Sequence, residues 1–199
     1  MKHYIDITLL PSDDIDIHFL WTKVMMQIHL AFVEMQNEVQ KIPAAISFPN
    51  YRCEVGEKKA FLGNKVRLLA PDKSDLEKLN IGRWLNRLTD YVHIKEIADV
   101  PNDVSEYECF SRRIKAGSPE KHIRRRMKRK NETQEQAAEF FADYKMAEAD
   151  KQLPFIHMKS LSGDQSFRLV IQRKTVGAAP NCNAYSTYGL SAEGVLPKF

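Results

Sequence analysis

The chain has few of the features that mark metalloproteins or disulfide-stabilised proteins. Its three cysteines, Cys53, Cys109 and Cys182, are far apart and odd in number. We therefore expect reduced, packed thiols rather than a disulfide framework. The sequence also lacks CxxC and HExxH motifs and carboxylate clusters at ligand spacing. We expect no metal site and no cofactor, so any hydrolytic chemistry would proceed without a metal ion.

Long apolar segments are missing as well. No window of the sequence comes near the about 18 consecutive apolar residues of a membrane-spanning helix, so we expect no contact with a membrane. The opening residues, MKHYIDITLL, lack the basic region and apolar stretch of a secretory signal. Together with reduced cysteines, this favours a cytoplasmic protein. There is no internal repeat, and 199 residues that are 43% hydrophobic suffice for one large or two small domains.

What the chain does have is concentrated positive charge. Residues 112–130 contain ten Lys or Arg residues and one acid, Glu120, which gives a net charge of about +9. Because the whole chain carries +4, the remaining 180 residues together carry about −5. Such a concentration favours a polyanionic partner, since each neutralised phosphate releases counterions. The alternative is a solvated basic face or a basic tail without a partner.

The second half of this segment has the pattern of an anchored helix rather than a tail. Ser118 suits the N-cap, Pro119 the first helical position, and Glu120 the first turn. Ile123 and Met127 fall on one narrow stripe, which we expect to dock against a core.

Cations cover the other side of the predicted helix. His122 and Arg126 lie on its flank, and five further basic residues point away from the apolar stripe. These five are Lys121, Arg124, Arg125, Lys128 and Arg129. A basic stripe on one helix is the electrostatic footprint of a nucleic-acid-binding protein. His122, among arginines, is better suited to contact a phosphate than to act as a base.

The N-terminal half shows the periodicities of alternating strands and helices. Alternation of apolar and polar residues predicts a strand at residues 4–10, and shorter apolar runs predict strands at 44–48, 65–70 and 93–97. Apolar residues at spacings of three and four predict helices at 17–35 and 72–91. The order strand, helix, strand, strand, helix, strand is that of a ferredoxin-like fold, whose antiparallel sheet carries both helices on one face.

A segment rich in Pro, Asn and Asp near residue 100 predicts a boundary between a domain 1–100 and a domain 104–199. In the second domain we predict strands at 104–114, 155–160 and 167–174, the last two joined around Gly163 and Asp164. We therefore predict an α+β protein, in which a ferredoxin-like domain precedes a smaller α+β domain with an arginine-rich helix.

A further helix should follow the basic one. It would begin at Thr133, which forms a capping box with Gln136. Phe140, Phe141 and Tyr144 would supply its core face.

If RNA is the ligand, cleavage without a metal ion needs only a few catalytic groups. The ribose 2′-hydroxyl is a built-in nucleophile, and an enzyme must remove its proton, align it and stabilise charge on the phosphate. Among six histidines, His29 stands out because it follows Ile28 at the border of a helical apolar stripe. A side chain there is half-buried and rigid, as a base should be. The alternative is a histidine that only fills the seam between helix and sheet.

Two other places combine polar and aromatic groups. The loop at residues 160–166 carries three hydroxyls on a hairpin tip, and Phe167 follows it. Hydroxyls there could hold ribose or phosphate while the aromatic ring stacks on a base; a plain polar turn before a core strand is equally compatible. Tyr188 beside Gly189 is similarly ambiguous, being either a core phenol or part of a site.

Taken in chain order, these features resemble the subtype I-F CRISPR repeat-processing endoribonucleases, the Csy-type branch of the wider Cas six family. The resemblance is carried by His29 on its helix, the basic helix that begins SPE, the Ser-x-Ser hairpin with its Phe, and YGLS near the end. The opening HYIDI, the ISFP at residues 46–49 and the final aromatic residue extend it through most of the chain. The ordered set, rather than any one motif, is specific.

The resemblance implies a metal-independent RNase that cuts precursor CRISPR RNA at the 3′ base of a repeat hairpin. The 2′-hydroxyl attacks the adjacent phosphate, giving a 5′-hydroxyl fragment and a cyclic or 3′-phosphate end. It also implies that the enzyme keeps its crRNA product and joins other subunits of a type I-F surveillance complex. We expect the free enzyme to be a monomer.

By position, the resemblance assigns roles to individual residues. His29 matches the catalytic histidine, Ser160 the serine that holds the ribose, and Tyr188 the tyrosine that lines the site. Ser162 would be a secondary contact, and Phe167 would stack beneath the stem. The basic RNA-binding residues would be Arg112, Arg113, Lys115, Lys121, His122, Arg124, Arg125, Arg126, Lys128 and Arg129.

One departure from the family lies just before the basic helix. The family has an Arg-x-Gln pair that reads base edges at the bottom of the stem, whereas residues 112–115 here are Arg-Arg-Ile-Lys. Either Arg113 and Lys115 take the place of that pair in a shifted register, or one base contact is absent. Arginine pairs well with guanine, whereas lysine is a less directional donor.

Two other functions use the same features. A non-catalytic RNA chaperone or scaffold could bind through the basic helix alone. A DNA-binding regulator could use SPEKHIRRR as a recognition helix, but no paired helix precedes it and residues 104–114 have the pattern of a strand.

Overall fold

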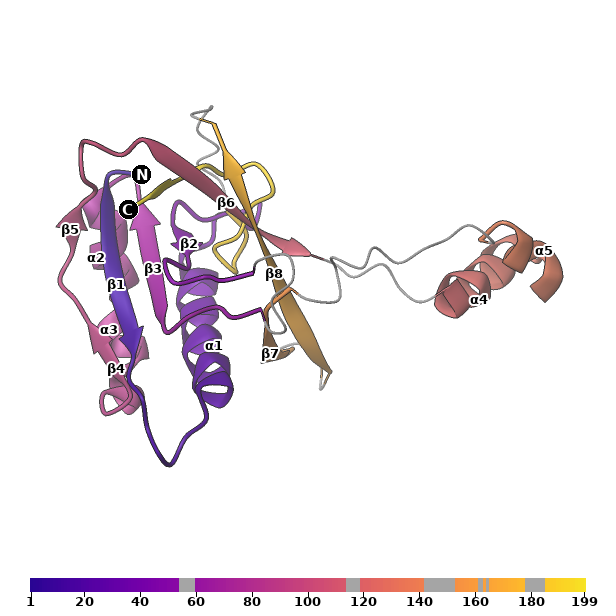
Figure 1. Ribbon diagram of the computed structural model, residues 1–199, viewed down its shortest axis with the longest axis horizontal. Helices are drawn as coiled ribbons and strands as arrows, with labels where there is room; N and C mark the ends of the chain where they lie inside the picture. Colours follow the sequence, from indigo (N-terminus) through magenta and orange to yellow (C-terminus); the bar gives the residue numbers. More distant parts are fainter. Residues whose placement is uncertain (54–59, 114–118, 142–152, 161–162, 164, 178–184) are drawn as a thin grey trace.

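The architecture is described from a computed structural model of the chain (Figure 1). The structure describes residues 1–53, 60–113, 119–141, 153–160, 163, 165–177 and 185–199. These residues form two antiparallel sheets with accompanying helices, so the predicted α+β class is confirmed. Both sheets and most helices lie together, and the two helices of the basic segment lie to one side (Figure 1).

The first sheet is built from the N-terminal half. Its strands follow the order β2-β3-β1-β4, with β5 also pairing with β1, and all pairs are antiparallel. The strands are β1 (His3–Leu9), β2 (Ala45–Ser47), β3 (Lys65–Ala70), β4 (Val92–Ile94) and β5 (Ala98–Asp99). The single strand predicted at 93–97 is wrong: the chain pairs with β1 twice, through β4 and then β5, with a break between them.

Helix α1 (Ile17–Met35) carries much of the core. It begins where the Asp16 side chain accepts a hydrogen bond from the His18 backbone N–H at 2.8 Å, which satisfies a donor that the first turn leaves open. Its buried residues repeat at the spacing of one helical face; they are Leu20, Trp21, Val24, Met25, Ile28, Ala31 and Phe32. A long, well-packed helix is a rigid platform for the side chains at the border of that face.

The continuous helix predicted over residues 72–91 is wrong. The chain instead forms α2 (Lys73–Leu79), α3 (Ile81–Trp84) and the 3-10 helix η1 (Asn86–Leu88). Asn80 separates the first two, with φ 43° and ψ 54°, and its N–H donates to carbonyls in the last turn of α2. Asparagine tolerates this left-handed conformation better than most residues, so it can end a helix within an uninterrupted apolar pattern.

The second sheet is built from the C-terminal half and has the order β7-β8-β6-β9, again antiparallel throughout. Its strands are β6 (Glu106–Arg113), β7 (Phe155–Lys159), β8 (Ser166–Val176) and β9 (Leu196–Lys198). The first three correspond to the predicted strands. The fourth brings the end of the chain beside β6, which the local pattern did not indicate.

One hydrophobic cluster joins the two sheets. The ring of Phe110 on β6 lies with its centroid 5.3 Å from that of Phe48 and 5.8 Å from that of Tyr51. The Tyr51 hydroxyl donates to the backbone carbonyl of Ile171 at 3.1 Å, and α1 packs against β7. Side chains from both halves of the chain therefore meet in one packed body. The predicted boundary between domains 1–100 and 104–199 falls between β5 and β6, and the division itself stays a prediction.

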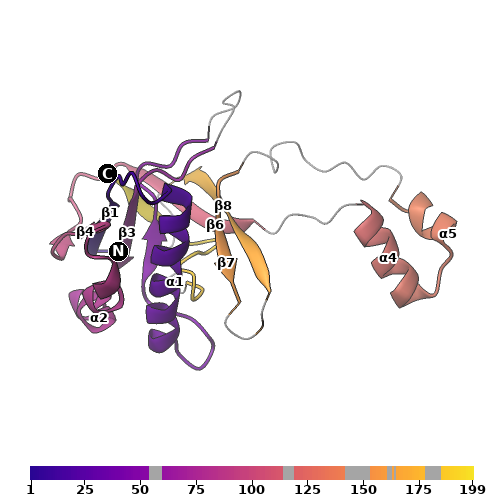
Figure 2. The same ribbon diagram turned by 90° about the horizontal axis from the view of Figure 1, so that it is seen from below.

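Helices α4 (Pro119–Lys130) and α5 (Gln134–Glu139) pack on each other beside the main body (Figures 1 and 2). The predicted capping box of α5 is confirmed, since the Thr133 hydroxyl accepts from the Gln136 N–H at 3.3 Å and the Gln136 side chain accepts from the Thr133 N–H at 3.0 Å. Ile123 and Met127 are half-buried and do not belong to the cluster that joins the sheets. The predicted docking against a core is therefore not seen with the cluster that joins the sheets, since α4 packs on the short α5 instead.

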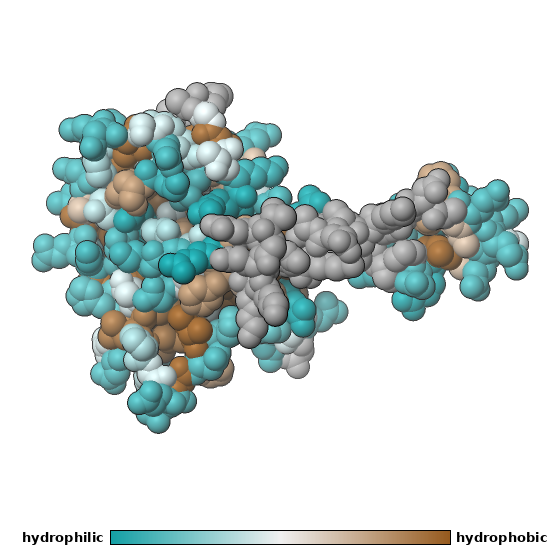
Figure 3. Space-filling view, viewed as in Figure 1, coloured by the Kyte–Doolittle hydropathy of each residue, from teal (hydrophilic) through white to brown (hydrophobic). Residues whose placement is uncertain are grey.

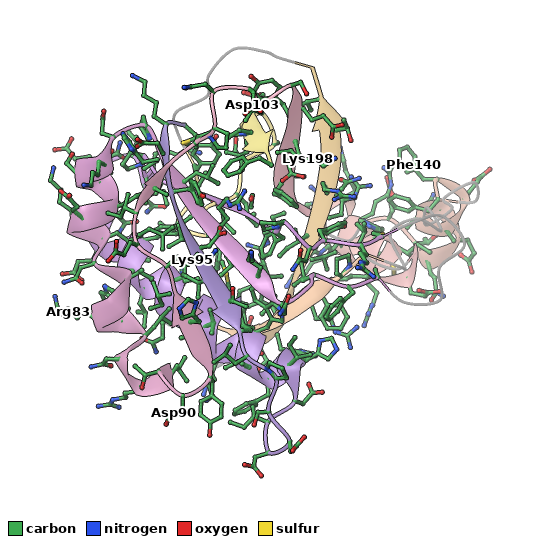
Figure 4. All side chains as sticks on the ribbon, turned by 60° about the vertical axis from the view of Figure 1, so that its left-hand side comes forward. Arg83, Asp90, Lys95, Asp103, Phe140 and Lys198 are labelled. Carbon is green, nitrogen blue, oxygen red and sulfur yellow. The ribbon has the colours of Figure 1, made fainter. Side chains whose placement is uncertain are left out.

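The predicted core face after Thr133 is only partly present. Phe140 is 65% exposed, so its assignment to a core is wrong. Phe140 lies at the end of α5 (Figure 4). Its ring is beside Arg126, whose guanidinium carbon lies 3.8 Å from the ring centroid. Phe141 is half-buried. The predicted N-cap Ser118 and the core residue Tyr144 lie outside the described residues.

Candidate functional site

His29 sits on α1 directly after the fully buried Ile28, and its own side chain is half-buried. Its Nδ1 atom lies 2.8 Å from the backbone carbonyl oxygen of Thr187. Its ring is parallel to that of Tyr188, with centroids 4.2 Å apart and 6° between the planes. The hydrogen bond to Thr187 and the stacking on Tyr188 together fix the orientation of the imidazole ring.

The residues that hold His29 belong to a tight turn. The Gly189 N–H donates to the Ser186 carbonyl at 2.7 Å, which closes the turn around Thr187 and Tyr188. Hydrogen bonds of 3.0 and 3.1 Å between Ile42 and Tyr185 attach the start of the turn to the segment before β2. A further bond, from the Ile46 N–H on β2 to the Gly189 carbonyl, joins the turn to the first sheet. The turn is therefore anchored on the first sheet, although in sequence it lies between β8 and β9 of the second.

An aromatic and cationic cluster extends from Tyr188. Phe167, the second residue of β8, makes an edge contact with Tyr188 at 6.3 Å between centroids and 83° between planes. The guanidinium carbon of Arg112, near the end of β6, lies 5.1 Å from the Phe167 centroid and 5.7 Å from that of Tyr188. An exposed arginine held over two rings presents planar donors to an anion beside a surface on which a base could stack.

A groove of about 480 Å³ opens on one side of this cluster. Arg112, Thr187 and Tyr188 line one part of it, and Lys41 supplies a second cation. Ser111, Ser186 and Ser191 also line the groove, and this polar, cationic lining suits phosphate or sugar oxygens.

Ser160 lies at the end of β7, the strand that packs against α1. Its backbone N–H donates to the Gln165 carbonyl at 2.9 Å, which closes the hairpin between β7 and β8. The side chain is half-buried. Two residues assigned by the resemblance, Ser162 and Lys115, lie outside the described residues.

The basic helix α4 lies apart from α1, the helix that carries His29, in both ribbon views (Figures 1 and 2). Six of its cations are exposed, namely Lys121, Arg124, Arg125, Lys128, Arg129 and Lys130. Hydrophilic side chains dominate the visible surface of α4 and α5 (Figure 3). The structure thus does not bring the cations of α4 into the His29 cluster.

Two residues predicted to bind RNA have partners within the α4–α5 pair. Arg126 is bonded to both carboxylate oxygens of Glu132, at 2.6 and 3.0 Å, and packs on Phe140. The His122 ring lies 5.6 Å from that of Phe141. Arg113 is exposed at the last residue of β6, close in sequence to Arg112.

Among the residues that the structure describes, no three His, Cys, Asp or Glu side chains gather as a metal site would need. Cys53 and Cys109 are free thiols, and burial raises the pKa of the Cys109 thiol. No described helix is long and apolar enough to cross a membrane.

Sequence reasoning did not identify the Thr187 carbonyl. A backbone acceptor leaves no trace in residue type, and Thr187 is 158 positions away from the histidine it contacts. The one signal in the sequence was the Tyr-Gly pair that follows, because glycine after a tyrosine marks a turn.

The whole chain is similar in sequence to proteins of known family. The chain matches, over residues 4–199, the family described as CRISPR-associated protein (Cas_Csy4). It is 30% identical over 200 residues to the "CRISPR-associated endonuclease Cas6/Csy4" of Escherichia coli (strain UTI89 / UPEC), covering 100% of both chains. It is also 30% identical over 199 residues to the protein of the same name from Pseudomonas aeruginosa (strain UCBPP-PA14), again covering 100% of both.

A solved structure named "CRISPR associated protein Cas6" aligns with 99% of this chain and 98% of its own, at 11% identity and a TM-score of 0.32. That likeness is too weak to support a conclusion. The family match and the full-length relatives are sufficient without it: this chain belongs to the Cas_Csy4 family of CRISPR-associated proteins.

Proposed function

We propose that this chain is an endoribonuclease that processes precursor CRISPR RNA by cutting at the 3′ base of the repeat hairpin. The observation that carries the proposal is the half-buried His29, stacked on Tyr188 and hydrogen-bonded to Thr187 beside a cationic groove. Two full-length relatives that are named as CRISPR-associated endonucleases support it. The proposed reaction uses the RNA's own 2′-hydroxyl and needs no metal ion.

In the proposed reaction, His29 accepts the proton of the 2′-hydroxyl while that oxygen forms a bond to the neighbouring phosphorus. The bond from phosphorus to the 5′ oxygen breaks, and the leaving oxygen takes a proton from water to become a 5′-hydroxyl, while His29 returns its proton to the solvent. The other fragment ends in a cyclic phosphate, which water can open to a 3′-phosphate. Histidine suits the proton transfer because its ordinary pKa lies near neutrality. Ser160 would hold the ribose in line for attack.

RNA binding would involve the basic helix and several residues around the His29 cluster. Helix α4 would lie in the major groove of the hairpin stem. That groove is deep and narrow in A-form RNA, but it opens near the end of a short stem, where long arginine side chains reach phosphates. Phe167 would stack beneath the stem, Arg112 or Arg113 would contact its lowest base pairs, and Ser162 and Lys115 would add contacts. Recognition would then depend largely on hairpin shape and charge.

The proposal includes the wider organisation of the protein. Residues 1–100 would form a ferredoxin-like domain carrying His29, which the strand order β2-β3-β1-β4 supports. Residues 104–199 would form the RNA-binding domain. We further propose that the enzyme is a monomer when free, works in the cytoplasm, and stays on its crRNA in a type I-F surveillance complex.

One incubation series tests the activity. Wild-type protein is mixed with labelled hairpin RNAs in EDTA, and the cut site and end groups are mapped. We expect a 5′-hydroxyl fragment, a cyclic or 3′-phosphate end, and no cutting of RNA with a 2′-deoxy sugar at the cleavage site. Cutting of the deoxy substrate would show that water is the nucleophile, and loss of cutting in EDTA would contradict metal independence.

Two variants on one helix test the histidine. His29→Ala should abolish cutting while hairpin affinity stays nearly unchanged. The exposed His18, also on α1, gives the matched control, so His18→Ala should cut like wild type. An active His29→Ala variant would remove His29 from the mechanism.

A second function is favoured by one observation, the separation of the basic helix α4 from α1, the helix that carries His29 (Figure 1). A protein built this way could hold structured RNA without cutting it. Tight hairpin binding with no cleavage by wild type under any of these conditions would support such a scaffold.

A further inference from the structure

The two ring nitrogens of His29 are not equivalent. Nδ1 lies 2.8 Å from the backbone carbonyl oxygen of Thr187. A carbonyl oxygen can only accept a hydrogen bond, so this contact requires a proton on Nδ1. In the neutral ring, Nε2 then has no proton and keeps a free lone pair. A general base needs that lone pair, and a histidine with the opposite tautomer would present an N–H instead.

The turn that supplies this carbonyl is held from three directions. The Gly189 N–H bonds to the Ser186 carbonyl at 2.7 Å, and the Ser186 hydroxyl bonds to the Leu190 carbonyl at 2.9 Å. The Ile46 N–H on β2 donates to the Gly189 carbonyl at 2.9 Å. The turn is thereby attached to the same sheet on which α1 packs, and Thr187 cannot move away from His29 without breaking these bonds.

Gly189 is the residue that permits this close packing. Its φ is +69°, a region that residues with a Cβ rarely adopt. A Cβ at this position would lie 2.5 Å from Cγ1 of Ile46 and 2.8 Å from Cε2 of Phe32. Phe32 is on α1, one turn after His29 and fully buried. Any side chain at position 189 would therefore push the turn away from the helix that carries the histidine.

We propose that the turn formed by residues 186–189 selects the tautomer of His29 and sets its orientation, with Gly189 and Ser186 as positioning residues. The Thr187 carbonyl fixes the proton on Nδ1, and the parallel Tyr188 ring fixes the plane of the imidazole. When His29 accepts a proton on Nε2, the Nδ1–H bond to the carbonyl becomes charge-assisted and stronger. The inference rests on the proposed function for its catalytic meaning, but the tautomer is a property of the protein alone.

The direct test is ¹⁵N NMR of the histidine rings in the free, full-length protein, at a pH where His29 is neutral. His29→Gln identifies the signals. We expect one long-lived tautomer with the proton on Nδ1 and none on Nε2. A proton on Nε2, or a rapidly averaging mixture, would overturn the inference. Because no RNA is present, this result does not depend on whether the chain is a nuclease.

Substitutions in the turn then test whether it affects the cleavage rate. Gly189→Ala should lower the single-turnover cleavage rate on the order of 10–100-fold, as expected for a displaced reactive group, and should change the pH dependence of that rate. Hairpin affinity should stay within about twofold, because the exposed cations of α4 remain in place. Gly82→Ala is the control, since a Cβ there meets no atom within 4 Å.

Ser186→Ala loosens the same turn without inserting bulk, so it covers the case in which Gly189→Ala does not fold. It should lower the rate about 3–10-fold and broaden the His29 tautomer signal. A folded variant of either kind with wild-type rate and pH profile would contradict the positioning role. If His29→Ala still cut RNA while the wild-type tautomer was as expected, the proposed function would fail and the tautomer assignment would stand.

Discussion

The carboxylate of Asp6 and the guanidinium of Arg67 form a buried two-point ion pair between β1 and β3, with Nε to Oδ1 at 2.7 Å and Nη2 to Oδ2 at 3.1 Å. The remaining Arg67 nitrogen donates to the backbone oxygen of Phe199 at 2.8 Å, and the guanidinium carbon lies 3.8 Å from the Phe199 ring centroid. One side chain of the first sheet therefore holds the end of the chain, next to β9 of the second. The ion pair thus links β1 to β3, and through Phe199 the Arg67 side chain also links the first sheet to the second.

Asp6→Asn should destabilise the protein by about 3–5 kcal/mol, because it leaves a buried guanidinium without its counter-charge. Burial on its own would raise the pKa of Asp6, but hydrogen bonds and charge from Arg67, with help from Lys65, lower it below its ordinary value. The stabilisation is therefore present above the carboxyl's ordinary pKa and is lost as the pH falls below it.

Urea unfolding of wild type and variant at neutral pH measures the difference in unfolding free energy. The exposed pair of Lys73 and Glu77 on α2 offers a control, since Glu77→Gln should change stability by less than about 0.5 kcal/mol. An equally small effect of Asp6→Asn would show that the buried pair contributes little.

Glu108 should make the protein less stable as the pH rises through neutrality. It is buried on β6, and burial raises its pKa to about 7, while Arg173, Lys198 and Arg67 act in the opposite direction and Glu106 adds to the rise. The folded state thus binds this proton more tightly than the unfolded state does. Stability is greatest below the ordinary carboxyl pKa and falls as the pH rises through about 7.

Replacing the carboxyl by its neutral isostere removes this dependence. Glu108→Gln should be more stable than wild type at pH 8, by on the order of 2 kcal/mol, and nearly equal to it at pH 4. Thermal or urea unfolding of both proteins between pH 4 and 8 measures the slope. A stability difference that does not change with pH would show that Glu108 titrates normally in the folded state.

Removal of the Tyr188 ring should slow cleavage, whereas removal of its hydroxyl should not. Tyr188 packs on His29 through the face of its ring, at 4.2 Å between centroids. Tyr188→Ala should lower the single-turnover rate about tenfold, the scale expected when an aromatic pair is removed. Tyr188→Phe keeps the stack and should stay within about threefold of wild type. A larger decrease in Tyr188→Phe would indicate that the hydroxyl takes part in the reaction.

Three exposed arginines of α4 should set the salt dependence of hairpin binding. Replacing Arg124, Arg125 and Arg129 together by Ala should weaken binding and reduce the slope of log K against log salt. The expected reduction is about 0.7–0.9 for each phosphate that the variant no longer neutralises. Filter binding at several salt concentrations gives the slope, and cleavage at saturating protein should be little changed.

A matched variant removes the same charge elsewhere. Lys78, Arg83 and Arg87 are exposed on α2, α3 and η1, and their triple replacement by Ala should leave the slope as in wild type. Equal effects of the two triple variants would mean that RNA binding follows net charge and not the basic helix.

Local patterns in the sequence determined much of this fold. Residues 65–70 form a strand and Thr133 with Gln136 forms a capping box, because both features depend on neighbours within a few positions. The apolar stripe of α1 likewise placed His29 at the border of a buried face, where the structure has it. Local spacing also indicated the antiparallel α+β class and the concentration of charge at residues 112–130.

Only the tertiary structure decided what these elements contact. Asn80 breaks a helix that the apolar spacing alone would continue, and α4 packs on α5 rather than on the large core. The partner of His29 is a backbone carbonyl 158 positions away, which residue type cannot reveal. For Asn80 the reason is a left-handed backbone conformation that apolar spacing does not record. For α4 and His29 the reason is that the lowest free energy depends on contacts between distant segments, and a one-dimensional pattern records which face of an element is buried but not what buries it.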